Sequence, residues 1–202
     1  MSAYKAVSVL LAFLSFGLAA PARAGTITLY EPNIGGNFID QAPGGGGPYW
    51  AVTNDSAFMT FCLEHNEVFY YGQPYEYTLN DDLTDATKWL YAEVRSDLYK
   101  NVDIFGSGPG VGARVQEAIW FLQGGLPGNE IAKESKDLAD FALTQNWSEL
   151  YDAGYRVQRV HMAGDGEQDQ LYYDHDPSAV PEPASMILLG TGILAVFRAR
   201  KA

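Results

Sequence analysis

Two short apolar runs, one near each end of the chain, limit what this sequence can fold into. The first covers residues 6–20 and the second residues 184–197 of a 202-residue chain. Both are shorter than the roughly 17–25 residues that a membrane-crossing helix normally uses. The segment between them, residues 25–176, is long enough for one ordinary domain with its own core.

The N-terminal run has the three parts of a secretory signal. A basic start at residues 1–5 precedes the apolar run, and Ala22-Arg23-Ala24 follows it as an A-x-A cleavage site. A transmembrane anchor is the alternative, but the short run ends at Pro21 and the cleavage site. We therefore expect residues 1–24 to be a signal peptide, removed by signal peptidase, so that the mature chain begins at Gly25.

The C-terminal run is built differently. It follows the motif Pro181-Glu182-Pro183 and ends in a basic tail that contains Arg198, Arg200 and Lys201. The prolines favour an extended entry, and the basic tail favours a cytoplasmic end. A buried core helix is disfavoured, because three cations follow the run directly.

This tripartite tail closely resembles the PEP-CTERM sorting signal. The resemblance implies that residues 177–202 form a sorting signal with a hydrophobic anchor helix, and that an exosortase processes it. It also implies transient anchoring in the inner membrane, followed by delivery to the outer envelope or extracellular matrix of a Gram-negative bacterium. The resemblance gives a destination and says nothing about activity.

Charge and cysteine content exclude several classes of function. The formal net charge of -12 argues against nucleic acid as a partner, because phosphate binding needs clustered Lys and Arg. The single cysteine, Cys62, excludes an internal disulfide and any multi-cysteine zinc site. We expect no cofactor and no metal centre.

The pattern of apolar residues predicts an α+β fold. Alternation predicts strands near both ends of residues 25–176, and helical spacing predicts helices between them. This order indicates a β-sandwich or barrel with a helical insertion. The expected strands cover residues 26–30, 58–63, 75–79, 155–161 and 170–173, and the expected helices cover residues 84–100 and 113–122, with a third after Gly128-Asn129.

A free thiol in an exported protein needs an explanation. Cys62 lies in a strand pattern between Phe61 and Leu63, and a downstream helix places Gln116 and Trp120 on one face. Together, Phe61-Cys62-Leu63 and the segment 115–120 resemble the motifs of thioester domains in bacterial surface adhesins. The resemblance implies a Cys62–Gln116 thioester that attaches the protein covalently to an amine or hydroxyl on a surface. The fold must keep water from such a bond, and we expect the aromatic side chains of Phe61 and Trp120 to shield it.

Other interpretations of the same residues stay open. Cys62 could be a buried small hydrophobe in a structural or polysaccharide-associated matrix module. It could also pair with His65 in a cysteine hydrolase. Residues 165–169 carry alternating acids, as calcium loops do, but lack the full spacing, and a turn is favoured. Without a recognised catalytic motif, we expect a non-enzymatic protein.

Overall fold

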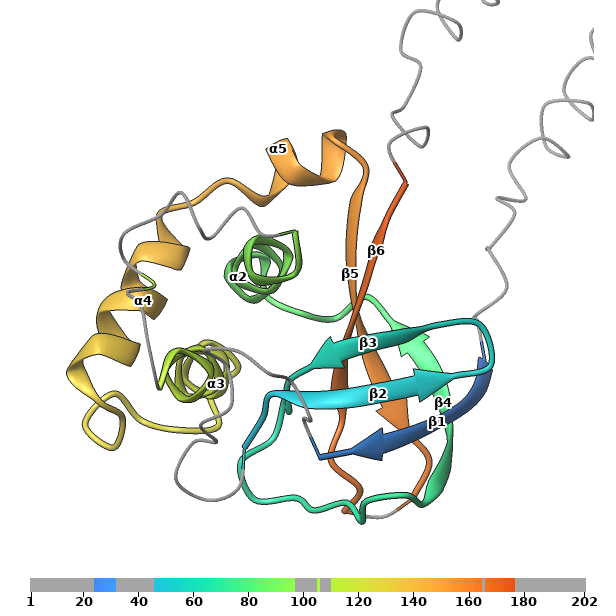
Figure 1. Ribbon diagram of the computed structural model, residues 1–202. Helices are drawn as coiled ribbons and strands as arrows, with labels where there is room; N and C mark the ends of the chain where they lie inside the picture. The colour runs from blue at the N-terminus through green and yellow to red at the C-terminus, as the bar shows by residue number, and fades with distance from the viewer. Residues whose placement is uncertain (1–23, 32–45, 97–104, 106–109, 165, 177–202) are drawn as a thin grey trace, which may run out of the picture.

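The computed structural model describes residues 24–31, 46–96, 105, 110–164 and 166–176 (Figure 1). The expected signal peptide, the sorting motif and the basic tail lie outside these ranges. Within them, no helix has the length and apolar character needed to cross a membrane.

The strands form one six-stranded antiparallel sheet in the order β3-β2-β1-β4-β5-β6. Burial alternates along β4, where Tyr75 and Leu79 are buried between exposed neighbours, as a sheet with one face on the core requires. Along β3 and β6 burial does not alternate, because consecutive residues are buried where these two strands meet. The strands are β1 (Ala24–Tyr30), β2 (Tyr49–Thr53), β3 (Ala57–Thr60), β4 (Pro74–Asn80), β5 (Tyr155–Met162) and β6 (Gln170–His175).

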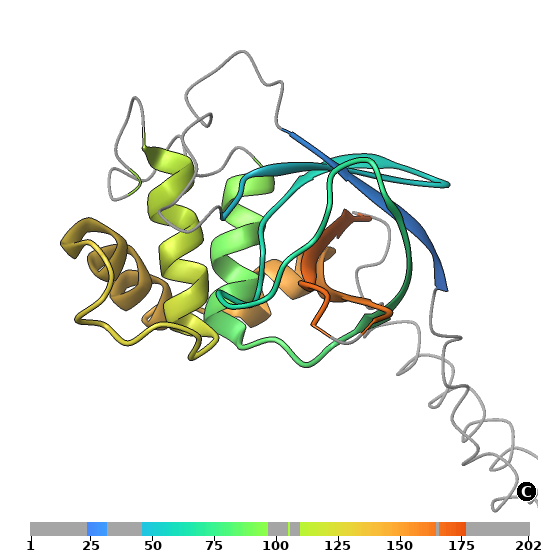
Figure 2. The same ribbon diagram turned by 90° about the horizontal axis from the view of Figure 1, so that it is seen from below.

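The two edges of this sheet meet, so it curls into a nearly closed barrel (Figure 2). Thr60 Oγ1 donates to the Leu171 carbonyl at 2.7 Å, and Leu171 N donates to the Phe61 carbonyl at 3.1 Å. Cys62 then bridges to Gln170, and Leu63 N donates to the Asp169 carbonyl at 3.0 Å. The chain just after β3 is therefore paired with the chain around the start of β6.

The helices lie between β4 and β5 in sequence and pack on one side of the barrel (Figure 1). Thr84 caps the first of them, since its hydroxyl accepts a hydrogen bond from Thr87 N at 3.2 Å. Fully buried Leu90, Val115 and Leu138 join the helices to one another and to Phe61 of the barrel. The helices are α2 (Asp85–Arg95), α3 (Val111–Leu122), α4 (Lys133–Leu143) and α5 (Trp147–Asp152).

The expected α+β class is confirmed, and of the two expected architectures the barrel is the observed one. The sequence pattern missed β2, which follows the glycine-rich segment directly, and α5, which is too short to show a helical period. The predicted strand at 58–63 was also too long. In the structure β3 ends at Thr60, and Cys62 pairs with Gln170 where the two edges of the sheet meet.

Candidate functional site

Cys62 lies at the seam of the barrel, on the side that faces α3. Its side chain has no exposed surface, and it forms a small cluster with Tyr49 of β2 and Trp120 of α3. Because directly opposite residues of an antiparallel pair point to the same face, the bridge to Gln170 places that side chain beside the sulfur. The site is thus assembled from three regions distant in sequence: the chain from β2 to just after β3, helix α3 and the start of β6.

Four groups contact the sulfur. Sγ lies 2.7 Å from Gln168 Oε1 and 3.5 Å from Gln170 Nε2. The backbone N–H of Gly47 and the hydroxyl of Tyr49 also hydrogen-bond to Cys62. Burial raises the pKa of the Cys62 thiol to about 12, although hydrogen bonds from Gln170, Gly47 and Tyr49 oppose that rise. The unreacted thiol is therefore neutral. The hydrogen-bond donors of Gln170, Gly47 and Tyr49 would stabilise negative charge that develops on the sulfur.

Gln116 is next to Cys62, as the resemblance to thioester domains implied, but its amide pairs with the backbone. Gln116 Oε1 accepts from Cys62 N at 3.0 Å, and Gln116 Nε2 donates to the Cys62 carbonyl at 2.8 Å. The fully buried side-chain amide of Gln116 thus pairs with the N–H and carbonyl of Cys62, as a neighbouring strand would, and holds the main chain of Cys62 in place. The Cys62–Gln116 thioester itself stays a prediction.

The two expected shielding residues lie on different sides of the main chain. Trp120 is 1% exposed and belongs to the cluster of Cys62, whereas Phe61 points into the core shared with the helices. Successive residues of an extended chain alternate in direction, which explains the separation of Phe61 from its neighbour's sulfur. Of the two, Trp120 is the residue beside the sulfur.

The buried carboxylate of Asp169 and the partly buried side chains of Arg159 and Glu64 anchor the segment that carries Gln168 and Gln170. Between them, the carboxylate of Asp169 accepts from Met162 N at 3.0 Å and from Arg159 Nη1 at 3.0 Å. Arg159 also pairs with Glu64 at 2.6 Å, and Glu64 Oε2 accepts from Asp169 N at 2.8 Å. This network links the glutamines to β5 and to the chain after Cys62. It also occupies the carboxylate of Asp169, which the calcium interpretation would have needed.

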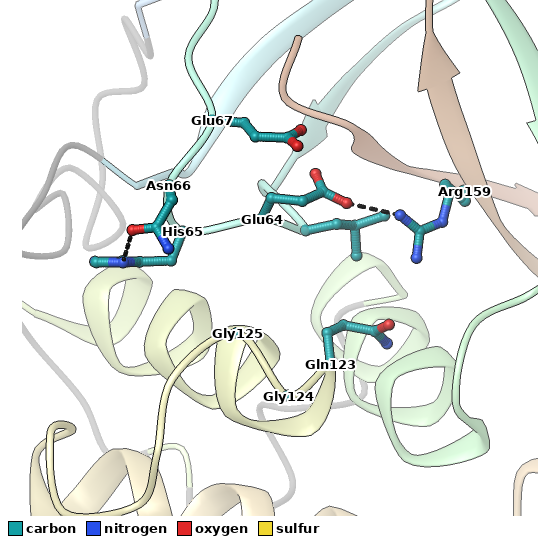
Figure 3. A pocket seen from close by; sticks show the side chains of 9 residues that line it. Glu64, His65, Asn66, Glu67, Gln123, Gly124, Gly125 and Arg159 are labelled. Atoms are coloured by element: carbon teal, nitrogen blue, oxygen red, sulfur yellow. Dashed lines mark hydrogen bonds and ion pairs between the residues drawn. The ribbon is translucent and has the colours of Figure 1, made fainter. Parts of the chain in front are cut away.

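His65 does not form a catalytic pair with the sulfur in this arrangement. Its ring packs edge-on against Trp120 at a centroid distance of 4.7 Å, and its Nδ1 lies 3.1 Å from Asn66 Oδ1. His65 and Asn66 line an open pocket of about 280 Å³, together with Glu64, Glu67 and Arg159 (Figure 3). Cys62 is not among the residues that line this pocket. Among the described residues, no group of three or more His, Cys, Asp or Glu side chains is placed to hold a metal ion.

Gly46, three residues before β2, is packed tightly against this site. A Cβ on Gly46 would lie 2.3 Å from Trp120 Cη2 and 2.5 Å from Gln116 Cγ. We expect Gly46→Ala to lower the free energy of unfolding by about 2 kcal/mol, because neither buried side chain has room to move. Urea denaturation measures this loss. Gly125→Ala is the matched control, since its Cβ would meet no atom closer than 3.5 Å; equal losses for the two variants would contradict the explanation.

Sequence reasoning missed Gln168, Gln170 and Tyr49. The signal for the glutamines is their alternation around Asp169, which puts both side chains on one side of an extended chain. Their pairing partner, however, lies more than a hundred residues earlier, and only closure of the barrel brings Cys62 to them.

The comparison with protein families identifies the C-terminal tail. Residues 179–201 match the PEP-CTERM protein-sorting motif, which includes Pro181, Glu182 and Pro183 and the basic residues Arg198, Arg200 and Lys201. This confirms the sorting signal expected from the sequence. The chain is therefore an exported protein that is anchored transiently to the membrane and processed by an exosortase.

Comparison with solved structures finds a distant neighbour of the folded domain. It is the N-terminal domain of the Streptococcus pyogenes pilus tip adhesin Cpa, with a TM-score of 0.48 and 10% sequence identity. The match covers 77% of this chain and 95% of that one. No curated protein matches the sequence.

Proposed function

We propose that this exported protein attaches covalently to its target through an internal thioester at Cys62. The supporting observation is the 2.7 Å separation of Cys62 Sγ and Gln168 Oε1. That distance is short for a hydrogen bond to sulfur, which has a larger radius than oxygen. It suits a sulfur and an oxygen bonded to one carbonyl carbon. Gln168 is therefore favoured as the acyl donor, and Gln116 is the second candidate.

The bond would form without a cofactor. The sulfur of Cys62 adds to the carboxamide carbon of the glutamine, the C–N bond breaks, and ammonia leaves with the thiol proton. A surface amine later attacks the same carbon, so that an amide forms and Cys62 regains its thiol. Burial keeps water from the thioester until that partner arrives. We further propose that the attachment takes place at the outer envelope or in the extracellular matrix of a Gram-negative bacterium.

Intact mass spectrometry of the purified folded domain tests the proposal. The wild type should weigh one ammonia less than its sequence, and Cys62→Ala should have full sequence mass. Methylamine should add to the wild type and free its thiol. A wild type with full sequence mass and a titratable thiol would overturn the proposal.

The position of the methylamine adduct identifies the acyl donor directly. Peptide mapping should find the methylamide on Gln168, with Gln116 unmodified. An adduct on Gln116 would show instead that the glutamine expected from the sequence is the donor. The adduct distinguishes the two even though Gln116→Ala could prevent bond formation indirectly, by releasing the Cys62 main chain that it holds.

A non-covalent matrix module that binds polysaccharide is the second candidate. It is supported by exposed aromatic side chains at one end of the barrel: Tyr30 and Trp50 are cross-strand neighbours, 44% and 37% exposed. Planar aromatic rings with a polar atom can stack on sugar rings while they stay hydrated. Tyr70 and Tyr71 are exposed as well. Retention of the Cys62→Ala protein on immobilised polysaccharide, lost with Trp50→Ala, would support this function.

A further inference from the structure

Tyr49 is the ionisable group held against the sulfur of Cys62. It is the first residue of β2, its side chain is 1% exposed, and it belongs to the cluster of Cys62 and Trp120. The ring of Phe69 packs edge-on against it at 4.8 Å, and Tyr71 packs on it at 6.0 Å. These contacts fix the ring, so the hydroxyl that hydrogen-bonds Cys62 has little freedom to turn away.

The other described hydrogen-bond partners of the sulfur cannot exchange a proton. Gly47 contributes a backbone amide, and Gln168 and Gln170 contribute side-chain amides. Tyr49 alone among these partners carries a proton that titrates in proteins. Burial, followed by the nearby Cys62 and Tyr71 side chains, raises the pKa of Tyr49 far above its ordinary value, so its hydroxyl stays protonated and donates.

Opening a thioester at this buried site needs such a donor. When an amine attacks the acyl carbon, the carbon–sulfur bond breaks and the electron pair stays on sulfur. A bare thiolate would be costly there, because burial already raises the pKa of the thiol to about 12. The attacking nitrogen, in contrast, has one proton too many. The reaction therefore has to move a proton from nitrogen to sulfur within a site closed to water.

We propose that Tyr49 is a catalytic proton relay: as the thioester opens, its hydroxyl passes a proton to Cys62 Sγ and in the same step takes one from the attacking amine, so that no tyrosinate forms. The proposal rests on the thioester proposed above. Formation of the thioester passes through the same intermediate in reverse, with ammonia as the amine. Tyr49 therefore serves both directions, and no further reactant is needed for atoms and charge to balance.

Tyr49→Phe is the decisive variant, because it removes one oxygen and keeps the packed ring. The pseudo-first-order rate of methylamine addition, followed by intact mass, should fall by about 10²-fold, the lower end of what proton transfer by a positioned side chain contributes. The wild-type rate should also be slower in D₂O than in H₂O, and the variant should lose that solvent isotope effect. A purely structural role for the hydroxyl would not alter the isotope effect.

Tyr91→Phe is the matched control. Tyr91 is another fully buried tyrosine, and its hydroxyl donates to the Met59 carbonyl at 2.6 Å, away from the sulfur. This variant should react at the wild-type rate even if it melts lower. A folded Tyr49→Phe protein that has full sequence mass, beside a Tyr91→Phe protein that is one ammonia lighter, would also support the proposal, since formation needs the same proton transfer.

The ways to fail are distinguishable. If the wild type is one ammonia lighter and Tyr49→Phe reacts at an unchanged rate with an unchanged isotope effect, the role of Tyr49 is overturned and the thioester stands. If the wild type itself has full sequence mass, both proposals are overturned.

Discussion

Replacing Asp169 by alanine should lower the free energy of unfolding by about 3 kcal/mol, as breaking a buried charge network does. The Asp169 side chain is only 7% exposed and holds three groups of β5: Met162 N, Arg159 and His161. Without the carboxylate, Met162 N–H is buried with no acceptor, and an unmade bond of this kind alone costs about 1–3 kcal/mol. The loss should appear in urea denaturation as a lower midpoint with an unchanged slope.

Two further variants separate the parts of this effect. Asp169→Asn keeps an oxygen for Met162 N and should recover part of the loss. Asp82→Ala removes a different partner of the same guanidinium, 2.9 Å from Arg159 Nε, but that side chain is 59% exposed. Exposed pairs contribute about 0–1 kcal/mol. Equal destabilisation by Asp82→Ala and Asp169→Ala would mean that burial of the network has no particular importance.

Asp169 also matters to the proposed thioester chemistry, because Gln168 and Gln170 are its neighbours in the chain. Their amides reach the sulfur only while this short segment is held to β5 and to Glu64. We therefore expect a larger fraction of Asp169→Ala molecules than of wild-type molecules to have full sequence mass, because fewer of them form the thioester and lose ammonia. Intact mass spectrometry measures this fraction at temperatures where the variant is still folded.

The sequence predicted most of the fold because its signals are local. Alternation in residues 75–79 and 155–161 and helical spacing in residues 113–122 need only near neighbours, and all three segments have the expected structure. β2 was missed because Tyr49-Trp50-Ala51-Val52-Thr53 follows prolines and glycines and lacks strict alternation of apolar and polar residues. Its position in the sheet is set by pairing with β1 and β3.

The site was harder to predict for a related reason. The sequence of residues 165–169 predicts only a turn with alternating acidic residues. Nothing in the residues around Gln170 indicates that it pairs with Cys62. Closure of the barrel is non-local, because it depends on the meeting of the two edge strands β3 and β6, which lie far apart in the chain. The resemblance to thioester domains did imply that Gln116 and Cys62 come together, and the hydrogen bond from Cys62 N to Gln116 Oε1 puts them side by side.

Trp120→Ala should have the second large effect, on both the stability of the protein and the lifetime of the proposed thioester. Removing a buried tryptophan costs about 3–5 kcal/mol, and Trp120 is 1% exposed. Its ring also fills the space beside Cys62, belongs to the same buried cluster as Tyr49, and packs against the ring of His65. Water that enters the resulting cavity would reach the acyl carbon. The thioester should therefore hydrolyse faster, seen by intact mass as the gain of one water in buffer without amine.

Phe61→Ala distinguishes shielding from general loosening of the fold. Phe61 is fully buried and its removal should destabilise the protein by a similar amount. Its side chain, however, lies in the core shared with the helices, on the other side of the main chain from the sulfur. The hydrolysis rates should be compared with each protein at the same number of degrees below its melting temperature. Under these conditions the thioester should hydrolyse faster than in the wild type only in the Trp120→Ala protein. If both variants hydrolyse equally fast, protection of the thioester comes from the stability of the whole domain, and Trp120 has no special place in it.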